Sequence, residues 1–294
     1  MGTQWQDVRY AFRMLARSPG FAAVLIVILA VGVGANTAVF CIVNTTFLRT
    51  LPYADPDRLL MVMEHQNSGD MGVSYPDFVD WRAQQDVFSG LALYHPESAK
   101  LKTAQTVELV STCMVSSDFF SVMNIDVVQG RGLTAEDDRV GAAPVAWVPH
   151  ETWQKYFAGD RELVGRMILL DGQGVTVAGI LPVNFRFHRR ADFYLPIAPY
   201  AEQLFLTMRE NHNDAYAIGR LKTGVTPTAA QAQMSAIAKR IEQQYPTVNA
   251  GIGVRVTSLR EHLAGQSRTQ LLLLLGAVGM VLLIVAVGAI ALAI

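Results

Sequence analysis

The chain has 294 residues, of which 51% are hydrophobic and only 17% are charged. Its net charge is −1 and its mean hydropathy is +0.26, values that suit an integral membrane protein better than a soluble enzyme. No Lys/Arg-rich run is present, so the sequence indicates no nucleic-acid partner. The two cysteines, Cys41 and Cys113, fall in segments that geometry would keep apart, which excludes a structural disulfide framework.

Residues 1–20 predict an amphipathic leader helix on the cytoplasmic face of a membrane. Apolar side chains recur there at helical spacing with three arginines between them. These residues are Trp5, Val8, Arg9, Phe12, Arg13, Leu15 and Arg17. Ser18-Pro-Gly20 then turns the chain into the bilayer. Because Lys and Arg gather on cytoplasmic flanks, we expect the N-terminus to lie inside the cell.

Two stretches, residues 21–43 and 271–294, hold no charged residue. A helix rising about 1.5 Å per residue over either stretch would cross a hydrocarbon core of about 30 Å. A cleaved signal peptide is the alternative for the first stretch, with Val33-Gly-Ala35 as a cleavage site. The apolar run continues to Val43, beyond the ~7–15 residues of a signal peptide, which favours an uncleaved transmembrane helix. Everything between the two helices then lies outside the cytoplasm.

The middle domain, residues 44–268, begins with the pattern of a strand followed by a helix. Residues 58–63 predict the strand. Ser74 is placed to cap the following helix, with Pro76 in its first turn and with Phe78 and Trp81 on one face. A second strand over 106–113 and a short helix over 117–123 follow.

A β-rich subdomain is predicted over about 133–210. It contains a strand at 144–148, a helix at 150–157 and a hairpin turning at Asp171-Gly-Gln-Gly174. The chain then returns to a strand at 215–221, and Thr226-Pro227 starts a helix whose buried face is Met234, Ile237 and Ile241. The fold class is therefore α+β: a porter-like β-α-β part, with the β-rich subdomain inserted, between two transmembrane helices.

No catalytic constellation is present, so we predict no catalytic, cofactor-binding or metal-binding residue. The sequence has no phosphate-binding Gly-Lys-Ser/Thr loop, no His-Glu-x-x-His and no Gly-x-Ser-x-Gly. His212-Asn-Asp214 comes closest to a metal-ligand cluster, but an ordinary solvated loop explains it better. Glu136-Asp-Asp138 is predicted to open a helix, where carboxylates are favoured, with a weak cation site as the alternative.

A series of short motifs follows in order along nearly the whole chain. They are residues 7–21 and 31–40, Leu51-Pro-Tyr53, Ser74-Tyr-Pro-Asp-Phe-Val-Asp-Trp81, Gly130-Arg-Gly-Leu133 and Arg220-Leu-Lys-Thr-Gly-Val-Thr226. This series resembles the N-terminal part of MacB/FtsX-like ABC transporter permeases, most closely the duplicated type of acidobacteria. Such permeases continue with further spans after the second, so we expect the sequence ending at Ile294 to be a fragment or a truncated frame.

The resemblance implies a MacB-like periplasmic core domain in a multi-pass protein of the bacterial inner membrane. It implies a non-catalytic subunit that passes ATP-driven motion to its periplasmic domain for export or efflux, with the ABC ATPase as a separate chain. Membrane lipid, a homodimer or pseudo-dimer contact and a periplasmic protein are the other implied partners. A two-span extracytoplasmic sensor or ligand-binding module has the same order of segments and stays the alternative. The missing motifs disfavour an extracytoplasmic hydrolase.

Overall fold

The computed structural model describes residues 53–263, except 104–105, 184, 186, 188–190, 205 and 213, and ten single positions within 19–37 and 273–280. The chain divides into two compact units, one of Met1–Arg49 with Leu263–Ile294 and one of Thr50–His262. The predicted leader and both predicted transmembrane helices fall almost entirely outside the described residues. Within the described part, no helix has the length and apolar character needed to cross a membrane.

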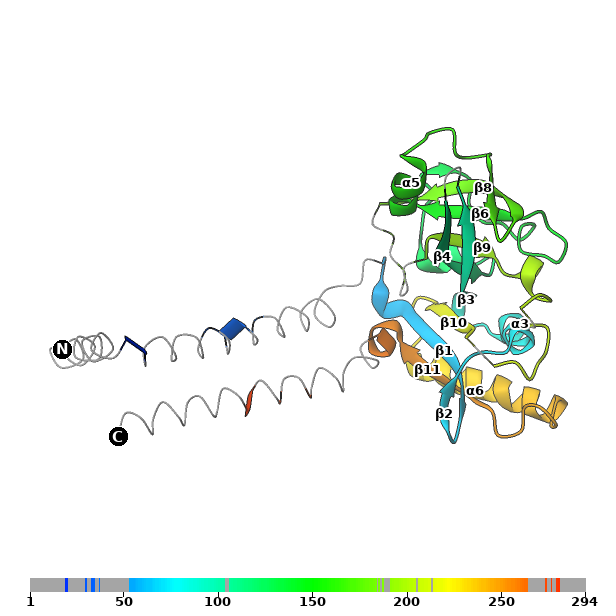
Figure 1. The fold of residues 1–294 in the computed structure, drawn as a ribbon. Coiled ribbons are helices and arrows are strands. Elements are labelled where there is room, and N and C mark those ends of the chain that lie inside the picture. The colour runs from blue at the N-terminus through cyan, green and yellow to red at the C-terminus, as the bar shows by residue number, and fades with distance from the viewer. Residues whose placement is uncertain are drawn as a thin grey trace. The chain divides into compact units, whose positions relative to one another are not determined.

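The second unit is a mixed α+β domain. Its strands are β1 (Leu59–Gln66), β2 (Gly69–Met71), β3 (Phe88–Lys102), β4 (Val107–Val115), β5 (Gln129–Gly130), β6 (Val145–Pro149), β7 (Met167–Leu170), β8 (Gln173–Leu181), β9 (Phe193–Pro196), β10 (Tyr216–Leu221) and β11 (Gly253–Ser258). Its helices are α3 (Tyr75–Gln84), α4 (Phe119–Met123), α5 (His150–Phe157) and α6 (Pro227–Gln244), with 3-10 turns η2 (Pro56–Arg58) and η3 (Ala198–Tyr200). The strands join in the order β11-β1-β10-β3-β4-β9-β6-β8-β5 (Figure 1), with β2 on β1 and β7 on β3 and β8.

The first and last segments of this unit form one β-α-β-β-α-β arrangement of the ferredoxin-like type. Strands β11, β1, β10 and β3 are antiparallel neighbours, and α3 contacts α6. The predicted face of α6 is buried, and the side chain of Thr226 caps the helix by accepting from Ala229 N at 3.2 Å. On α3 the predicted Phe78 and Trp81 are buried. Ser74 stands at the N-cap position of α3, but its side chain makes no capping hydrogen bond.

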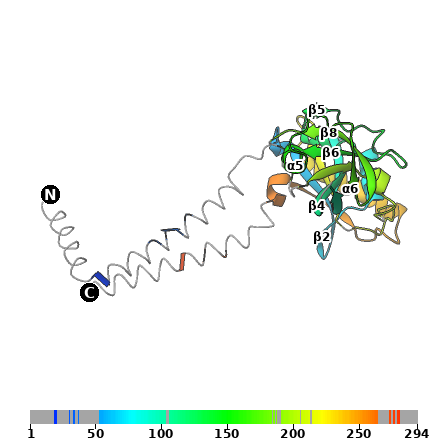
Figure 2. The ribbon, with the colours of Figure 1, turned by 45° about the horizontal axis from the view of Figure 1, so that its top comes forward.

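Strand β3 connects this ferredoxin-like part to the β-rich part. From Phe88 to Tyr94 it pairs with β10, and from Tyr94 to Lys102 it pairs with β4. Beyond β4 the sheet continues through β9, β6 and β8, with α5 against β6 and β8 (Figure 2). The two parts therefore share one continuous strand. The limits of the inserted subdomain, about 133–210, stay a prediction.

Two local predictions in the β-rich part have opposite outcomes. The hairpin is confirmed: Leu170 pairs with Gln173, and Asp171 and Gly172 have φ values of 49° and 78°, as a two-residue type I′ turn requires. The helix predicted to begin at Glu136-Asp-Asp138 is wrong, since these residues lie in a turn. The carboxylates there bind other segments instead. Asp137 pairs with Arg131 at 2.6 Å, and Asp138 accepts from the backbone amides of Ser117 and Ala198.

An aromatic cluster packs where the two parts meet. Tyr94 on β3 lies 5.3 Å from Tyr216 on β10 and 4.8 Å from Phe187, measured between ring centroids. Phe120 on α4 contacts Trp147 on β6 at 5.6 Å. Edge-to-face and offset aromatic contacts of this kind add about 0.5–1.5 kcal/mol each beyond area burial. The junction is thus a packed core rather than a flexible linker.

Candidate functional site

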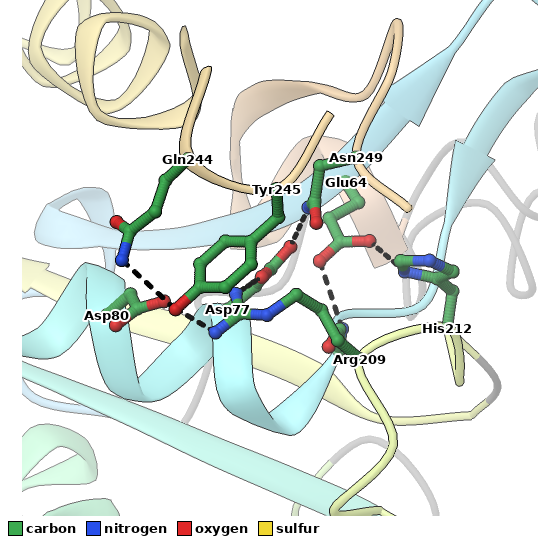
Figure 3. A network of polar contacts seen from close by, with 9 residues as sticks. Glu64, Asp77, Asp80, Arg209, His212, Gln244, Tyr245 and Asn249 are labelled. Atoms are coloured by element: carbon green, nitrogen blue, oxygen red, sulfur yellow. Dashed lines mark hydrogen bonds and ion pairs between the residues drawn. The ribbon is translucent and has the colours of Figure 1, made fainter. Parts of the chain in front are cut away.

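A cluster of charged side chains lies between β1, α3, the C-terminal end of α6 and residues 206–212 (Figure 3). We call residues 206–212, which lead from the β-rich part back toward β10, the return segment. The cluster begins at Glu64, the sixth residue of β1. Side chains alternate along a strand, so Glu64 shares a face with the buried Leu60 and Val62. Its side chain is 0% exposed, so its charge needs partners inside the protein.

Glu64 has a donor for each carboxylate oxygen. Oε1 accepts from the backbone amide of Ser74 at 3.0 Å, and Oε2 pairs with Nδ1 of His212 in the return segment. Burial raises the pKa of the Glu64 carboxyl. The hydrogen bond that His212 donates to Glu64 raises the pKa of His212 above its ordinary value. The pair therefore holds a proton to higher pH than an isolated histidine would.

Asp77, in the first turn of α3, is the second buried carboxylate, with a side chain only 2% exposed. Oδ1 pairs with Arg209 of the return segment, and Oδ2 accepts from Asn249 Nδ2 at 2.5 Å. Asp80, one helical turn later, accepts from Arg209 Nη2 at 2.8 Å. The i, i+3 spacing of the two aspartates thus presents a pair of carboxylates to one guanidinium.

Arg209 is also held by an aromatic ring. Its guanidinium carbon lies 3.8 Å from the ring centroid of Tyr245, the C-cap residue of α6. Burial disfavours the charged form, but the hydrogen bonds and charges of Asp80 and Asp77 prevail and raise the pKa of Arg209. A cation–π contact contributes about 0.5–1 kcal/mol at an exposed site and about 2 kcal/mol when desolvated. Arg209 therefore joins the return segment to both helices of the ferredoxin-like part.

The backbone of the return segment lies close to Gly72, the residue that follows β2. A Cβ atom built on Gly72 would stand 2.1 Å from the carbonyl oxygen of His212, so only glycine fits there. The amide of Val73 donates to Ala215 O at 2.7 Å, just beyond the segment. Leu206, at the other end of the segment, is 1% exposed in the hydrophobic core. Charged and apolar contacts therefore hold the return segment itself, and a backbone hydrogen bond holds the chain just after it.

This arrangement is suited to holding the return segment in place rather than to catalysis. All four carboxylate oxygens of Glu64 and Asp77 have hydrogen-bond donors within the protein. In the described residues, no group of three or more His, Cys, Asp or Glu side chains could hold a metal ion. The prediction of a simple solvated loop is wrong for His212, whose side chain is only 13% exposed. Asp214 does not join it, since its Oδ1 accepts from the hydroxyl of Tyr216 at 3.5 Å.

Comparison with protein families identifies the domain. The family model for the MacB-like periplasmic core domain matches residues 22–237. The chain belongs to this family. The resemblance to MacB/FtsX-like permeases is thereby confirmed, and membership implies that the described domain lies outside the cytoplasm. A comparison with curated proteins gives no match.

Solved structures support the same fold. The periplasmic region of MacB from Actinobacillus actinomycetemcomitans is 12% identical, with a TM-score of 0.53 over 72% of this chain and 92% of that one. The extracellular domain of the noncanonic ABC-type transporter YknZ from Gram-positive bacteria is 13% identical, with a TM-score of 0.51 over 67% of this chain and 99% of that one. At these identities the likeness shows the fold alone. It confirms a mixed α+β architecture of the MacB periplasmic type.

Proposed function

We propose that the chain is the N-terminal part of a permease that works with a separate ABC ATPase and passes ATP-driven motion to its extracytoplasmic domain for export or efflux. The observation that carries this proposal is the family match over residues 22–237. The two charge-free stretches, 21–43 and 271–294, support it, because they flank the predicted middle domain, residues 44–268, as transmembrane helices would. The arginines of the leader support a cytoplasmic N-terminus.

The first and last strands of the domain are suited to receive such motion. At the start of β1, Leu60 is paired with Ser258 at the end of β11. The chain therefore enters β1 and leaves β11 at the same end of the sheet, on neighbouring strands. A shift of one flanking helix against the other would act directly on this strand pair.

The entry into the domain is bonded to the sheet. Arg58 donates to the carbonyl oxygen of Leu221 through Nε at 3.0 Å and through Nη2 at 2.5 Å. Arg220 donates to Ala54 O at 2.8 Å from the same end of β10. Hydrogen bonds from charged donors contribute about 1.5–3 kcal/mol each. A bonded entry transmits displacement where a flexible linker would absorb it.

The cluster described above contributes to this transmission. We call it the polar cluster: Glu64, Asp77, Asp80, Arg209, His212, Tyr245 and Asn249. It fastens the return segment, which is the second chain connection between the β-rich part and the ferredoxin-like part, to β1 and α3. Motion received by β1 then reaches the β-rich part through two connections, β3 and the return segment.

The test is to purify the full-length native protein from the membranes of its own host and identify the proteins that accompany it. We expect an ABC ATPase to accompany it in near-stoichiometric amount. The rate of ATP hydrolysis by the complex should change in the variant Arg58→Gln, which removes the bonds to Leu221 O. Lys239→Gln, an exposed change on α6, is the matched control. Recovery of the intact protein without an ATPase from several detergents would overturn the proposal.

Orientation has its own measurement. Ser98, Val140 and Lys222 are exposed in the domain, so cysteines placed there should react with a membrane-impermeant maleimide in whole spheroplasts. The native Cys113 is buried and should not contribute. Labelling that appears only after the membrane is broken would place the domain in the cytoplasm and contradict the proposal.

A further inference from the structure

The hairpin of β3 and β4, together with β7, has an outward face of unusual composition. Lys100 pairs with Leu109, and Lys102 pairs with both Val107 and Leu169. Directly paired residues point to the same side of a sheet, as does Met167, two residues before Leu169. We call these six side chains the outer face: Lys100, Lys102, Val107, Leu109, Met167 and Leu169.

The apolar members of the outer face are well exposed. The exposed fractions are 62% for Val107, 75% for Leu109, 70% for Met167 and 36% for Leu169. The opposite side of the same strands already supplies the core, through residues such as Leu101, Val110 and Leu170. A sheet with one buried face normally presents polar residues on the other face. Four apolar side chains of six on the outward face therefore need an explanation other than folding.

The two lysines supply charge without partners of opposite sign. Among the described residues, neither ammonium group takes part in an ion pair of 4.0 Å or less. Asp171 contacts this side of the hairpin, but its Oδ1 accepts from the backbone amide of Lys100. Glu108 lies between Val107 and Leu109 and so points to the other side. The outer face thus combines exposed apolar area with uncompensated positive charge.

We propose that the outer face binds a partner protein through a segment that alternates apolar side chains with carboxylates. Apolar side chains of that segment would cover Val107, Leu109, Leu169 and Met167, while its carboxylates would pair with Lys100 and Lys102. Charge complementarity selects this occupant over a second copy of the same chain, because two outer faces would bring lysines against lysines. The proposal concerns the folded domain alone and does not depend on an ATPase.

The test uses three fluorescein-labelled peptides that alternate Leu with Glu, Leu with Gln or Leu with Lys, added to the purified full-length chain. Fluorescence anisotropy should show binding of the Glu peptide about tenfold tighter than that of the Gln peptide, with no binding of the Lys peptide. The preference should shrink as salt rises, because exposed charges are screened.

Two pairs of variants locate the binding. The double variant K100E/K102E should lose the Glu peptide and gain the Lys peptide, while the control K222E, an exposed lysine elsewhere, should change neither. L109Q should weaken binding severalfold, while V140Q should not, although Val140 is also 75% exposed. All of these side chains are exposed, so a circular dichroism spectrum and melting temperature close to wild type will show that loss of binding is not loss of fold.

Three results would overturn the proposal. Equal affinity for the Glu and Gln peptides would show that the charges select nothing. Self-association of the full chain that is abolished by L109Q would make a second copy the occupant. Binding of phosphatidylglycerol vesicles through Lys100 and Lys102, with no preference for the Glu peptide, would make the outer face a lipid-binding surface.

Discussion

The polar cluster and the outer face reverse the usual distribution of side chains in a folded domain. In the polar cluster, Glu64 and Asp77 carry charge at 0% and 2% exposure. On the outer face, Leu109 and Met167 carry apolar area at 75% and 70% exposure. Each region departs from the rule that charge faces water and apolar area faces the core.

The difference lies in what each region already contacts. The buried carboxylates have every oxygen bonded within the protein, so their interactions are complete and can serve only the fold and its motions. The apolar and lysine side chains of the outer face have no such partners among the described residues, so they are available to another molecule. Substitutions should therefore change stability in the first region and binding in the second.

Arg209→Ala should have the largest effect on stability. It leaves Asp77 buried with no cation and removes the partner of Asp80, which should lower the free energy of unfolding by about 3–5 kcal/mol. Urea unfolding followed by tryptophan fluorescence measures it. Arg166→Ala is the matched control: its pair with Asp160 is 59% and 40% exposed, so the loss should stay below about 1 kcal/mol. Equal losses in the two variants would contradict a special role for the cluster.

Gly72→Ala should cause the next largest loss of stability. The new methyl group would lie 2.1 Å from His212 O, so the return segment has to shift away from residue 72. Forcing extra volume into a packed site costs about 1–3 kcal/mol. Gly132→Ala, where nothing lies within 4 Å of the added atom, should be near neutral in the same urea experiment. Faster hydrogen exchange at residues 206–212 in Gly72→Ala would show that the segment has loosened.

The pH dependence of stability should reflect the protonation of the Glu64–His212 pair. Both groups have pKa values raised in the folded state, Glu64 by burial and His212 by its bond to Glu64, with the charges of Asp77 and Glu210 adding to the shift of His212. The folded state then binds more protons, so the contribution of His212 is complete below its ordinary pKa and is lost as pH rises through its raised value.

The comparison of wild type with His212→Gln isolates this contribution from other titrating groups. His262, for example, has a pKa lowered by burial and shifts stability in the opposite direction. We expect the difference in unfolding free energy between wild type and His212→Gln to be largest near pH 6 and to narrow steadily toward pH 9. A difference that stays constant over this range would mean that His212 contributes through packing alone.

The sequence predicts the elements of this fold better than its long-range contacts. The cap at Thr226, the turn at Asp171-Gly172 and the buried face of α6 are local patterns, and all three are confirmed. Strand β3, which the two parts share, is absent from the elements predicted from the sequence, because its pairing depends on partners far along the chain.

The polar cluster escaped prediction for the same reason. Glu64 and His212 are 148 residues apart, and Asp77 and Arg209 are 132 apart. The available signals were a glutamate that continues the apolar run of β1 and two aspartates at i, i+3 on a helix. Without the fold, nothing identifies their partners. Glu136-Asp-Asp138 suits a helix start because helix N-termini favour carboxylates, whereas here Asp137 pairs with Arg131 and Asp138 accepts from the amides of Ser117 and Ala198.

The smallest expected effect is on the outer face, where K100E/K102E and L109Q should each change unfolding free energy by no more than about 0.5 kcal/mol. These side chains leave water only if a partner covers them, so the isolated chain gains nothing from their identity. If these variants lose binding of the Glu peptide while their stability is unchanged, the outer face serves binding alone, in contrast to the polar cluster. A loss of 2 kcal/mol or more, roughly the cost of damaging a packed site, would instead show that the outer face is packed against this chain itself, and its apolar residues would then need no partner protein.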